Sequence, residues 1–441
     1  MRVRATDILG MIAAALVAAA HAHAQCPAAV PVQGAPLRGA APLFPADHWW
    51  NADVSAAPVD PQSAAYIAFI GASRRLHPDF GGTAAPGSTE IYGMPYAVVD
   101  GTQPKVAVTF DYADESDGAG VPFYPLPAQS IGQAHWVEGG APAAVDQRSQ
   151  SDRHLLVVDC TNRHLYELYN VWHDVGAARW YAGSGAVFDL DASDRRPDGW
   201  TSADAAGLAI LPGLVRYDEA WNPAVPDIGH AFRVTVRATN GYVYPASHRA
   251  GSTAGALPMG ARLRLKASVG GQDPALRTAD PNVRKIFRAM QKHGLIVADN
   301  GSDLYVTGTF DVRWNNDLLN PAFALLAAGD FDVIALGWKP APAAPPALAG
   351  LSLAPARVRG GGAALATVTL AAPAPAGGVA VALASSDSAH ATVPASVDVA
   401  AGASSAPFLV ATRPTRRDAP VTVTASAGGA TLSAVLTVTP R

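Results

Sequence analysis

The fold class is decided by the stretch HLLVVDCTNRHLYELY at residues 154–169. Its two ends are apolar and aromatic runs of strand length, and the polar residues 160–163 between them suit a turn, so the stretch predicts a β-hairpin. Further strands are predicted on both sides of it, at 105–110, 186–190, 231–237, 262–266 and 295–298. We therefore expect a mainly β protein whose large domain is β-sandwich-like or jelly-roll-like.

The same region carries signals for a few helices. Residues 63–71 predict a short helix that ends at a glycine. A second helix is predicted from Asp280, which can cap its first turn, to Gly294, which stops it. Its apolar stripe consists of Val283, Ile286, Phe287 and Met290.

The composition and the pattern of the sequence change after residue 338. Residues 339–350 are rich in proline and alanine and predict a stiff linker between a large domain at 47–338 and a small one at 351–441. The small domain consists of short alternating strands separated by Gly, Pro and Ser turns, which is typical of a β-sandwich. Its segment ASSDSAHATVP at residues 384–394 resembles bacterial immunoglobulin-like repeats of secreted proteins, which usually serve as spacers or surface-attachment modules.

The start of the chain predicts export. Arg2 and Arg4 precede an apolar run at 8–20, and Ala-His-Ala follows at 22–24, so residues 1–24 are interpreted as a signal peptide and 25–46 as a Pro/Ala-rich N-terminal segment. The mature protein would then be secreted into an oxidising compartment, where Cys26 and Cys160 either form one disulfide or stay free. No later segment is apolar for long enough to cross a membrane.

The composition narrows the function classes. The chain has 441 residues, of which 49% are hydrophobic and 15% charged, with a formal net charge of −4. This length predicts two or more domains, and the low net charge without a basic stripe argues against binding to nucleic acid. A monomer is expected.

Carboxylates in glycine-rich turns are the first candidates for chemistry. Cleavage of a glycosidic bond usually needs two carboxyl groups, one protonated and one ionised. We predict Glu219 as the proton donor, because it lies among apolar residues and tyrosine, and Asp189 at a strand end as its partner, with His230 and Asp299 shaping the site. The alternative is that such residues are caps and turn formers.

Two further segments were candidates for a calcium site and for a serine nucleophile. Residues 189–194 alternate oxygen ligands as calcium loops do, but they lack the glycine and the distal glutamate of an EF-hand, so structural calcium is left open beside a solvated acidic loop and no other metal or cofactor is predicted. Ser184 is flanked directly by glycines and does not fit the Gly-x-Ser-x-Gly elbow of serine hydrolases.

Aromatic residues in polar surroundings point to a carbohydrate. Indole rings can stack on the apolar faces of sugars, while neighbouring polar groups meet the hydroxyls; the alternative is that the tryptophans fix loops to the core. The residues predicted to bind substrate are Trp200, Trp221, Arg216, Tyr217 and His248.

Several segments of the large domain together resemble an uncharacterised family of secreted bacterial and fungal proteins. The segments are 184–191, 196–204, 211–219, 228–233 and 297–303, and the resemblance spans roughly residues 43–333. It implies one domain over this range and brings no established activity. We expect a secreted hydrolase that cleaves an extracellular polysaccharide with paired carboxylates, or, less favoured, a lyase with His230 or Tyr217 as the base. The alternative from a different class is a non-catalytic protein that binds a polysaccharide or cell-surface glycan.

Overall fold

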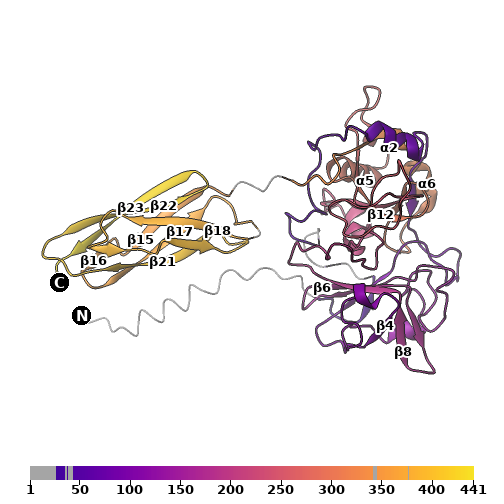
Figure 1. Cartoon of the computed structure of the whole chain (residues 1–441), viewed down its shortest axis with the longest axis horizontal. Helices are drawn as coiled ribbons and strands as arrows, with labels where there is room; N and C mark the ends of the chain where they lie inside the picture. The colour runs from indigo at the N-terminus through magenta and orange to yellow at the C-terminus, as the bar shows by residue number, and fades with distance from the viewer. Residues whose placement is uncertain (1–25, 35–36, 38–42, 341–344, 376) are drawn as a thin grey trace. The chain divides into compact units, whose positions relative to one another are not determined.

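The computed structural model describes residues 26–34, 37, 43–340, 345–375 and 377–441 (Figure 1). The signal-peptide prediction for residues 1–24 and parts of the 25–46 segment and of the linker lie outside these residues. The described chain divides into two compact units, one ending at Pro340 and one formed by the residues from Pro345 to Arg441. None of the helices in the described ranges is long and apolar enough to cross a membrane.

The predicted mainly β class is confirmed, with few helices among the described residues. The first sheet of the large unit has the strand order β1-β3-β5-β6-β9. Its members are β1 (Val32–Gln33), β3 (Tyr96–Val99), β5 (Leu155–Asp159), β6 (His164–Tyr169) and β9 (Ser184–Asp189). β5 and β6 are antiparallel neighbours, with Leu155 opposite Leu168, which confirms the predicted hairpin.

The second sheet is mixed and has the order β14-β11-β12-β10-β13-β2. Its members are β14 (Phe331–Val333), β11 (Arg262–Leu265), β12 (Leu295–Asn300), β10 (Phe232–Val236), β13 (Tyr305–Thr307) and β2 (His77–Asp79). A third, small sheet has the order β4-β8-β7, with β4 (Val108–Phe110), β8 (Arg179–Ala182) and β7 (Trp172–Asp174). Figure 1 shows β4, β6 and β8 toward one end of this unit and β12 with the longer helices toward the other.

The helices of the large unit are short except for α5. They are α2 (Ser63–Ile70), α3 (Gln129–Gly132), α4 (Tyr217–Ala220), α5 (Pro281–Lys292) and α6 (Asn316–Phe323). The Asp280 carboxylate caps α5 by accepting from the backbone N–H groups of Asn282 and Val283 at 2.8 and 3.0 Å, as predicted. The predicted apolar stripe of α5 is buried.

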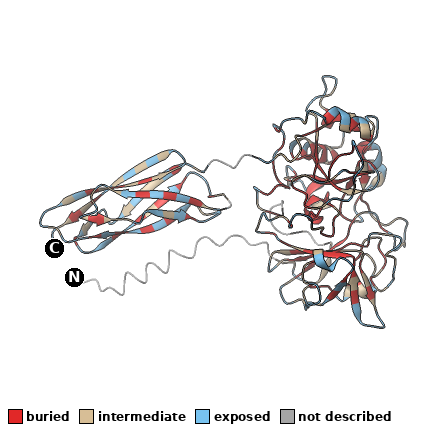
Figure 2. Cartoon of the chain, in the orientation of Figure 1, coloured by how far each residue is buried: buried red, intermediate tan, exposed pale blue. Residues whose placement is uncertain are grey.

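The first sheet is covered on both faces. Val98, Leu156 and Val158 belong to the main core, which also includes the second sheet, whereas Ala97 and Val157 belong to a separate core against the small sheet. Burial on both faces explains why β5 is an unbroken apolar run instead of an alternating one. The core strands stand out as buried in Figure 2.

A disulfide joins Cys26 to Cys160, with a Cα–Cα distance of 5.3 Å. Cys160 lies in the turn of the β5–β6 hairpin, so the bond ties the segment before β1 to the first sheet. Of the two alternatives left open by the sequence, the structure shows the paired one.

The C-terminal unit is a sandwich of two sheets, as predicted. One has the order β15-β17-β21-β19 and the other β16-β23-β22-β18-β20. The strands are β15 (Leu348–Ala354), β16 (Arg357–Arg359), β17 (Ala363–Leu370), β18 (Val379–Ser385), β19 (Ala391–Thr392), β20 (Ser396–Val399), β21 (Ser405–Thr412), β22 (Ala419–Ala427) and β23 (Ala430–Thr439). Alternate residues of β17 and β21 fill its separate core.

Candidate functional site

One face of the second sheet carries a row of polar side chains. Asp79 on β2 pairs with Thr307 on β13, and the antiparallel register of β13 with β10 continues from Val306–Val234 to Thr307–Arg233. Residues in one row of a sheet project to the same face. The Arg233 Nη1 atom accordingly donates to the Thr307 hydroxyl at 3.1 Å.

Arg233 is buried and binds two carboxylates. It donates to Asp204 through Nη2 at 2.8 Å and through Nε at 3.2 Å, and its Nη2 also lies 2.9 Å from the Asp299 carboxylate on β12. Burial raises the pKa of Asp204 to about 6 although Arg233 opposes this, and burial also raises the pKa of Asp299. A fixed cation therefore sits between two carboxyl groups of raised pKa.

A second charged pair, His154 and Glu138, lies within range of the Arg233 charge. His154, just before β5, places Nδ1 at 2.6 Å from the Glu138 carboxylate and Nε2 at 2.9 Å from the Ala203 carbonyl. Both ring nitrogens thus face acceptors, which requires a proton on each. Burial lowers the pKa of His154, but Glu138 more than reverses this, and the pKa rises to about 9. The imidazole is charged at neutral pH and does not act as a base.

We call Asp79, Glu138, His154, Asp204, Arg233 and Asp299 the Arg233 network. Its Asp204 and Arg233 side chains are 0% and 3% exposed, whereas Asp299 is 24% exposed and Glu138 21%. Burial, followed by the charge of Glu138, raises the pKa of the half-buried Asp79, with Arg233 acting in the opposite direction. The interior part of the network is therefore buried and its edge carries partly exposed carboxylates, and groups with shifted pKa values at such an edge make it a candidate functional site.

Behind the network, Glu167 on β6 is fully buried. Its carboxylate accepts from the backbone N–H groups of Ile210 and Leu211 at 2.7 and 2.9 Å. Burial raises its pKa to about 7, with these two hydrogen bonds acting in the opposite direction. Glu167 joins the first sheet to the loop that follows Asp204.

The structure places Glu219, the predicted proton donor, in a different cluster. Glu219 on α4 is 4% exposed and forms an ion pair with Arg216, and its other oxygen lies 2.9 Å from His230 Nε2. Burial and the charge of Arg216 lower the pKa of His230 to about 3, so this imidazole is neutral. We call these three residues the Arg216 cluster. A carboxyl group enclosed in this way cannot deliver a proton to an external substrate.

The local backbone conformation helps to explain why Glu219 lies in the interior. In an extended segment Asp218 and Glu219 would point to opposite faces, but Tyr217–Ala220 is a helical turn. The half-buried Asp218 forms an ion pair with Arg313 at 3.0 Å, while Glu219 turns into the interior.

Asp189 lies apart from both groups. It is the exposed last residue of β9, and its carboxylate accepts from the Asp191 backbone N–H at 2.9 Å. The structure brings Glu219 and His230 together but does not bring Asp189 to them, because Glu219 is enclosed and Asp189 is exposed. The predicted pairing of Glu219 with Asp189 is therefore not what the fold provides, and Asp299 alone of the four belongs to the Arg233 network.

The acidic loop at 189–194 offers few free ligands. The Asp191 carboxylate forms an ion pair with Arg163 at 2.6 Å. Across the parts of the chain that the structure describes, no group of three or more His, Cys, Asp or Glu side chains is arranged to hold a metal ion. Structural calcium remains a prediction that a chelator experiment would test.

The predicted substrate-binding residues fall into two places. Tyr217 and Trp221 stack with ring centroids 5.6 Å apart, and the Arg313 guanidinium lies 4.2 Å from the Tyr217 ring centroid, while Arg216 is buried in its cluster. Trp200 packs beside Arg196, and His248 Nδ1 lies 2.9 Å from the Ala205 carbonyl. Trp200 and His248 thus flank the loop that carries Asp204.

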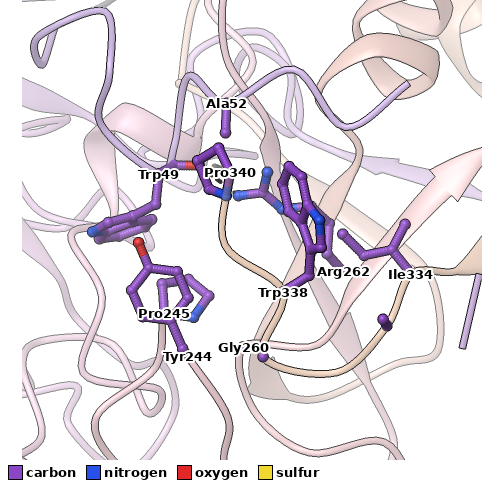
Figure 3. A pocket seen from close by; sticks show the side chains of 11 residues that line it. Trp49, Ala52, Tyr244, Pro245, Gly260, Arg262, Ile334, Trp338 and Pro340 are labelled. Atoms are coloured by element: carbon purple, nitrogen blue, oxygen red, sulfur yellow. Dashed lines mark hydrogen bonds between the residues drawn. The ribbon is translucent and has the colours of Figure 1, made fainter. Parts of the chain in front are cut away.

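Figure 3 shows a pocket lined by Trp49, Tyr244 and Trp338 around Arg262. Its volume is only about 20 Å³, which is room for one water molecule. Arg262 is buried and donates to the Trp49 carbonyl at 2.6 Å. These aromatic rings fix chain segments to the core and leave no space for a sugar.

A larger groove of about 580 Å³ lies between α5 and β11. Most of its cations are already engaged. Lys285 donates to three backbone carbonyls, and Arg288 pairs with Asp273 at 2.5 Å. Arg264 and Lys266 pair with Asp332, so most of the positive charge in the groove is not free for an incoming anion.

Of the Arg233 network, only Asp299 was predicted as a catalytic residue from the sequence. Arg233 and Glu167 are charged residues inside otherwise apolar strands, at AFRVTV and HLYELY. A charge at a core position must be paired, so this pattern is the signal that could have located the network.

Comparisons with known proteins add little to this geometry. A scan against protein-family models and a search of curated proteins found no match. Among solved structures, domains 4 and 5 of the S-layer protein SbsC match with 20% identity over 21% of this chain and 53% of that chain, at a TM-score of 0.17. WR4, a C. elegans MSP family member, matches with 14% identity over 21% of this chain and 97% of that chain, at a TM-score of 0.15. Likenesses this small assign neither fold nor function.

Proposed function

We propose that this chain is a secreted carbohydrate-active protein that hydrolyses an extracellular polysaccharide, with Asp79 and Asp299 of the Arg233 network as its paired carboxylates. The observation that carries the proposal is the accessible edge of the network: Asp299, a carboxyl group of raised pKa, contacts the buried Arg233 guanidinium at 2.9 Å, and Asp79, also of raised pKa, lies on the same sheet two strands from Arg233. This replaces Glu219 and Asp189 as the acting pair.

The surroundings of the two carboxyl groups suggest different roles. Asp299 contacts Arg233 at 2.9 Å, and this positive charge favours its ionised form. The pKa of Asp79 is raised by burial and by the negative charge of Glu138, which favours its protonated form. Asp79 is then the proton donor to the glycosidic oxygen, and Asp299 is the base or nucleophile that completes hydrolysis.

The buried members would keep this difference in place. Arg233 is held from the other side by Asp204, so its position does not depend on Asp299 alone. The charged His154 forms an ion pair with Glu138, the carboxylate that raises the pKa of Asp79, and its charge also acts to lower the pKa of Asp299. We further propose Trp200 and His248, which flank the loop that carries Asp204, as contacts for a sugar ring.

A second candidate is a glycan-binding protein without catalysis. It is favoured by the half-buried pair Tyr217 and Trp221, whose aromatic rings lie in the neighbourhood of the Arg216 cluster and outside the Arg233 network. Stacking on sugar faces needs aromatic area but no titrating carboxyl group.

One experiment separates the two candidates. The mature protein is incubated with a panel of glycans, and reducing ends and retention are read together. Asp79→Asn and Asp299→Asn should each lower turnover by roughly 10²–10⁴-fold with retention unchanged. Asp189→Asn, an exposed aspartate outside the network, is the matched control and should keep full turnover. Retention without cleavage by the wild type would replace the enzyme with the binding protein.

A further inference from the structure

Arg153 is buried completely, and within the described residues its guanidinium forms no hydrogen bond or ion pair with a charged side chain, although the charges of Glu138 and Asp146 act on it. Its guanidinium instead donates to four backbone carbonyls of one loop. Nη1 reaches the carbonyls of Glu138 and Ala141 at 3.1 and 2.9 Å, and Nη2 reaches those of Pro142 and Val145 at 2.9 and 3.4 Å.

This loop has little regular structure to hold it. Residues 138–145 contain no helix or strand, so their buried carbonyls need partners from elsewhere. A single planar guanidinium with several fixed donors suits this task better than any other side chain. Arg153 therefore supplies the hydrogen bonds that neighbouring backbone N–H groups would supply in a helix or sheet.

The backbone conformation of Arg153 is unfavourable for an arginine. Arg153 has a φ of 54°, in the left-handed region that is unfavourable for residues other than glycine, asparagine and aspartate. The four carbonyl contacts offset this cost, and they are available only because the chain turns there.

The loop held by Arg153 is the one that carries Glu138. Glu138 and His154 are further joined by the backbone, because the Glu138 N–H donates to the His154 carbonyl at 2.9 Å. The Glu138 carboxylate also accepts from the His154 backbone N–H at 3.2 Å, besides its 2.6 Å contact with the ring. Moving the loop would move this carboxylate.

We infer that Arg153 is a positioning residue: by gathering the carbonyls of residues 138–145 it holds Glu138 against His154, and so keeps the imidazole of the Arg233 network charged. Its importance for turnover rests on the proposed function, whereas its effect on His154 does not. Asp152 and Arg233 also act on His154, and the charge of His154 is felt in turn at Glu167, Asp204 and Asp299.

The test measures the protonation of His154 by NMR across a pH series, without any substrate. In the wild type the pKa is expected at about 9. Glu138→Gln gives the reference for a lost carboxylate: burial is then nearly unopposed and the pKa should fall below 6.5. Arg153→Met should lower the pKa in the same direction, and Arg153→Lys, which keeps charge but not the fork of donors, should give an intermediate value.

Arg264 provides the matched control, because its Nη1 atom also donates to three backbone carbonyls, those of Val54, Ser55 and Ala57. Arg264→Met should destabilise the protein without moving the His154 pKa. The inference is overturned if a folded Arg153→Met or Arg153→Lys protein keeps His154 at about 9, if Arg264→Met lowers it equally, or if both Arg153 variants fail to fold.

The proposed function fails separately. If the wild type cleaves no glycan but the His154 pKa responds as expected, the positioning role stands and the hydrolase does not. If the wild type is active, Arg153→Lys should lower kcat about tenfold or more with little change in KM and should shift the pH profile, which a loss of stability alone would not do.

Discussion

The large unit contains two buried charged groups built from the same residue types, and they differ in access to solvent. The Arg216 cluster consists of an arginine, a glutamate and a histidine that are all nearly inaccessible, and its imidazole is neutral. The Arg233 network also contains an arginine, a glutamate and a histidine, but its imidazole is charged and its Glu138 and Asp299 carboxylates are partly exposed. Residue types alone therefore do not locate a candidate site, because accessibility distinguishes an enclosed cluster from one whose carboxylates a ligand can reach.

The largest expected effect on stability is in the Arg216 cluster. Glu219→Gln leaves the buried Arg216 without its anionic partner, and breaking such a pair costs about 3–5 kcal/mol. Chemical denaturation should show this loss. Asp218→Asn, next in sequence but half-buried and paired with Arg313, should cost less than about 1 kcal/mol. Equal losses in the two variants would show that Glu219 is not enclosed as described.

The two histidines should give opposite dependences of stability on pH. The pKa of His230 is about 3 in the folded protein and near 6.5 in the unfolded chain, so the unfolded chain binds more protons between these values and stability falls as the pH drops below 6.5. The pKa of His154 is about 9 when folded, so its contribution is full below pH 6.5 and is lost as the pH rises toward 9.

Replacing each histidine with glutamine should therefore weaken the pH dependence of the free energy of unfolding over a different pH range. His230→Gln should reduce the acid slope, and His154→Gln the alkaline slope, each by up to about 1.4 kcal/mol per pH unit. The measurement is the free energy of unfolding of wild type and variants between about pH 4 and about pH 9. The same limb changing in both variants would contradict the assigned charge states.

The smallest effect should come from removing the C-terminal sandwich. It has its own core, so a chain cut near Pro345 should leave two pieces that fold independently, and the large piece should keep both charged groups unchanged. Calorimetry of the intact chain and of the pieces checks this. If residues 350–441 melt only together with the large unit, the two are not independent.

Much of the fold could be predicted from local patterns. The β5–β6 hairpin, the capped helix α5 and the sandwich strands follow from periodicity and turn residues close in sequence. The parallel pairings of β3 with β5 and of β10 with β12 could not be predicted in this way, because they join segments far apart in the chain.

The site was harder to predict for the same reason. Asp79, Glu138 and Asp299 come from distant parts of the chain, and only the tertiary fold brings them within range of the Arg233 charge. Glu219 was rightly placed in an apolar environment, but the sequence did not reveal that Arg216 and His230 enclose it. Local patterns indicate which side chains are buried, whereas the partners of those side chains depend on tertiary contacts.

The central claim is that the Arg233 network carries the chemistry and the Arg216 cluster carries stability. The most direct test measures turnover per folded molecule and the free energy of unfolding for Asp299→Asn and Glu219→Gln, on a glycan that the wild type cleaves. The account predicts that Asp299→Asn loses roughly 10²–10⁴-fold in turnover with a modest loss of stability, while Glu219→Gln keeps its turnover and loses stability. Full turnover in Asp299→Asn together with a stable, inactive Glu219→Gln protein would contradict it.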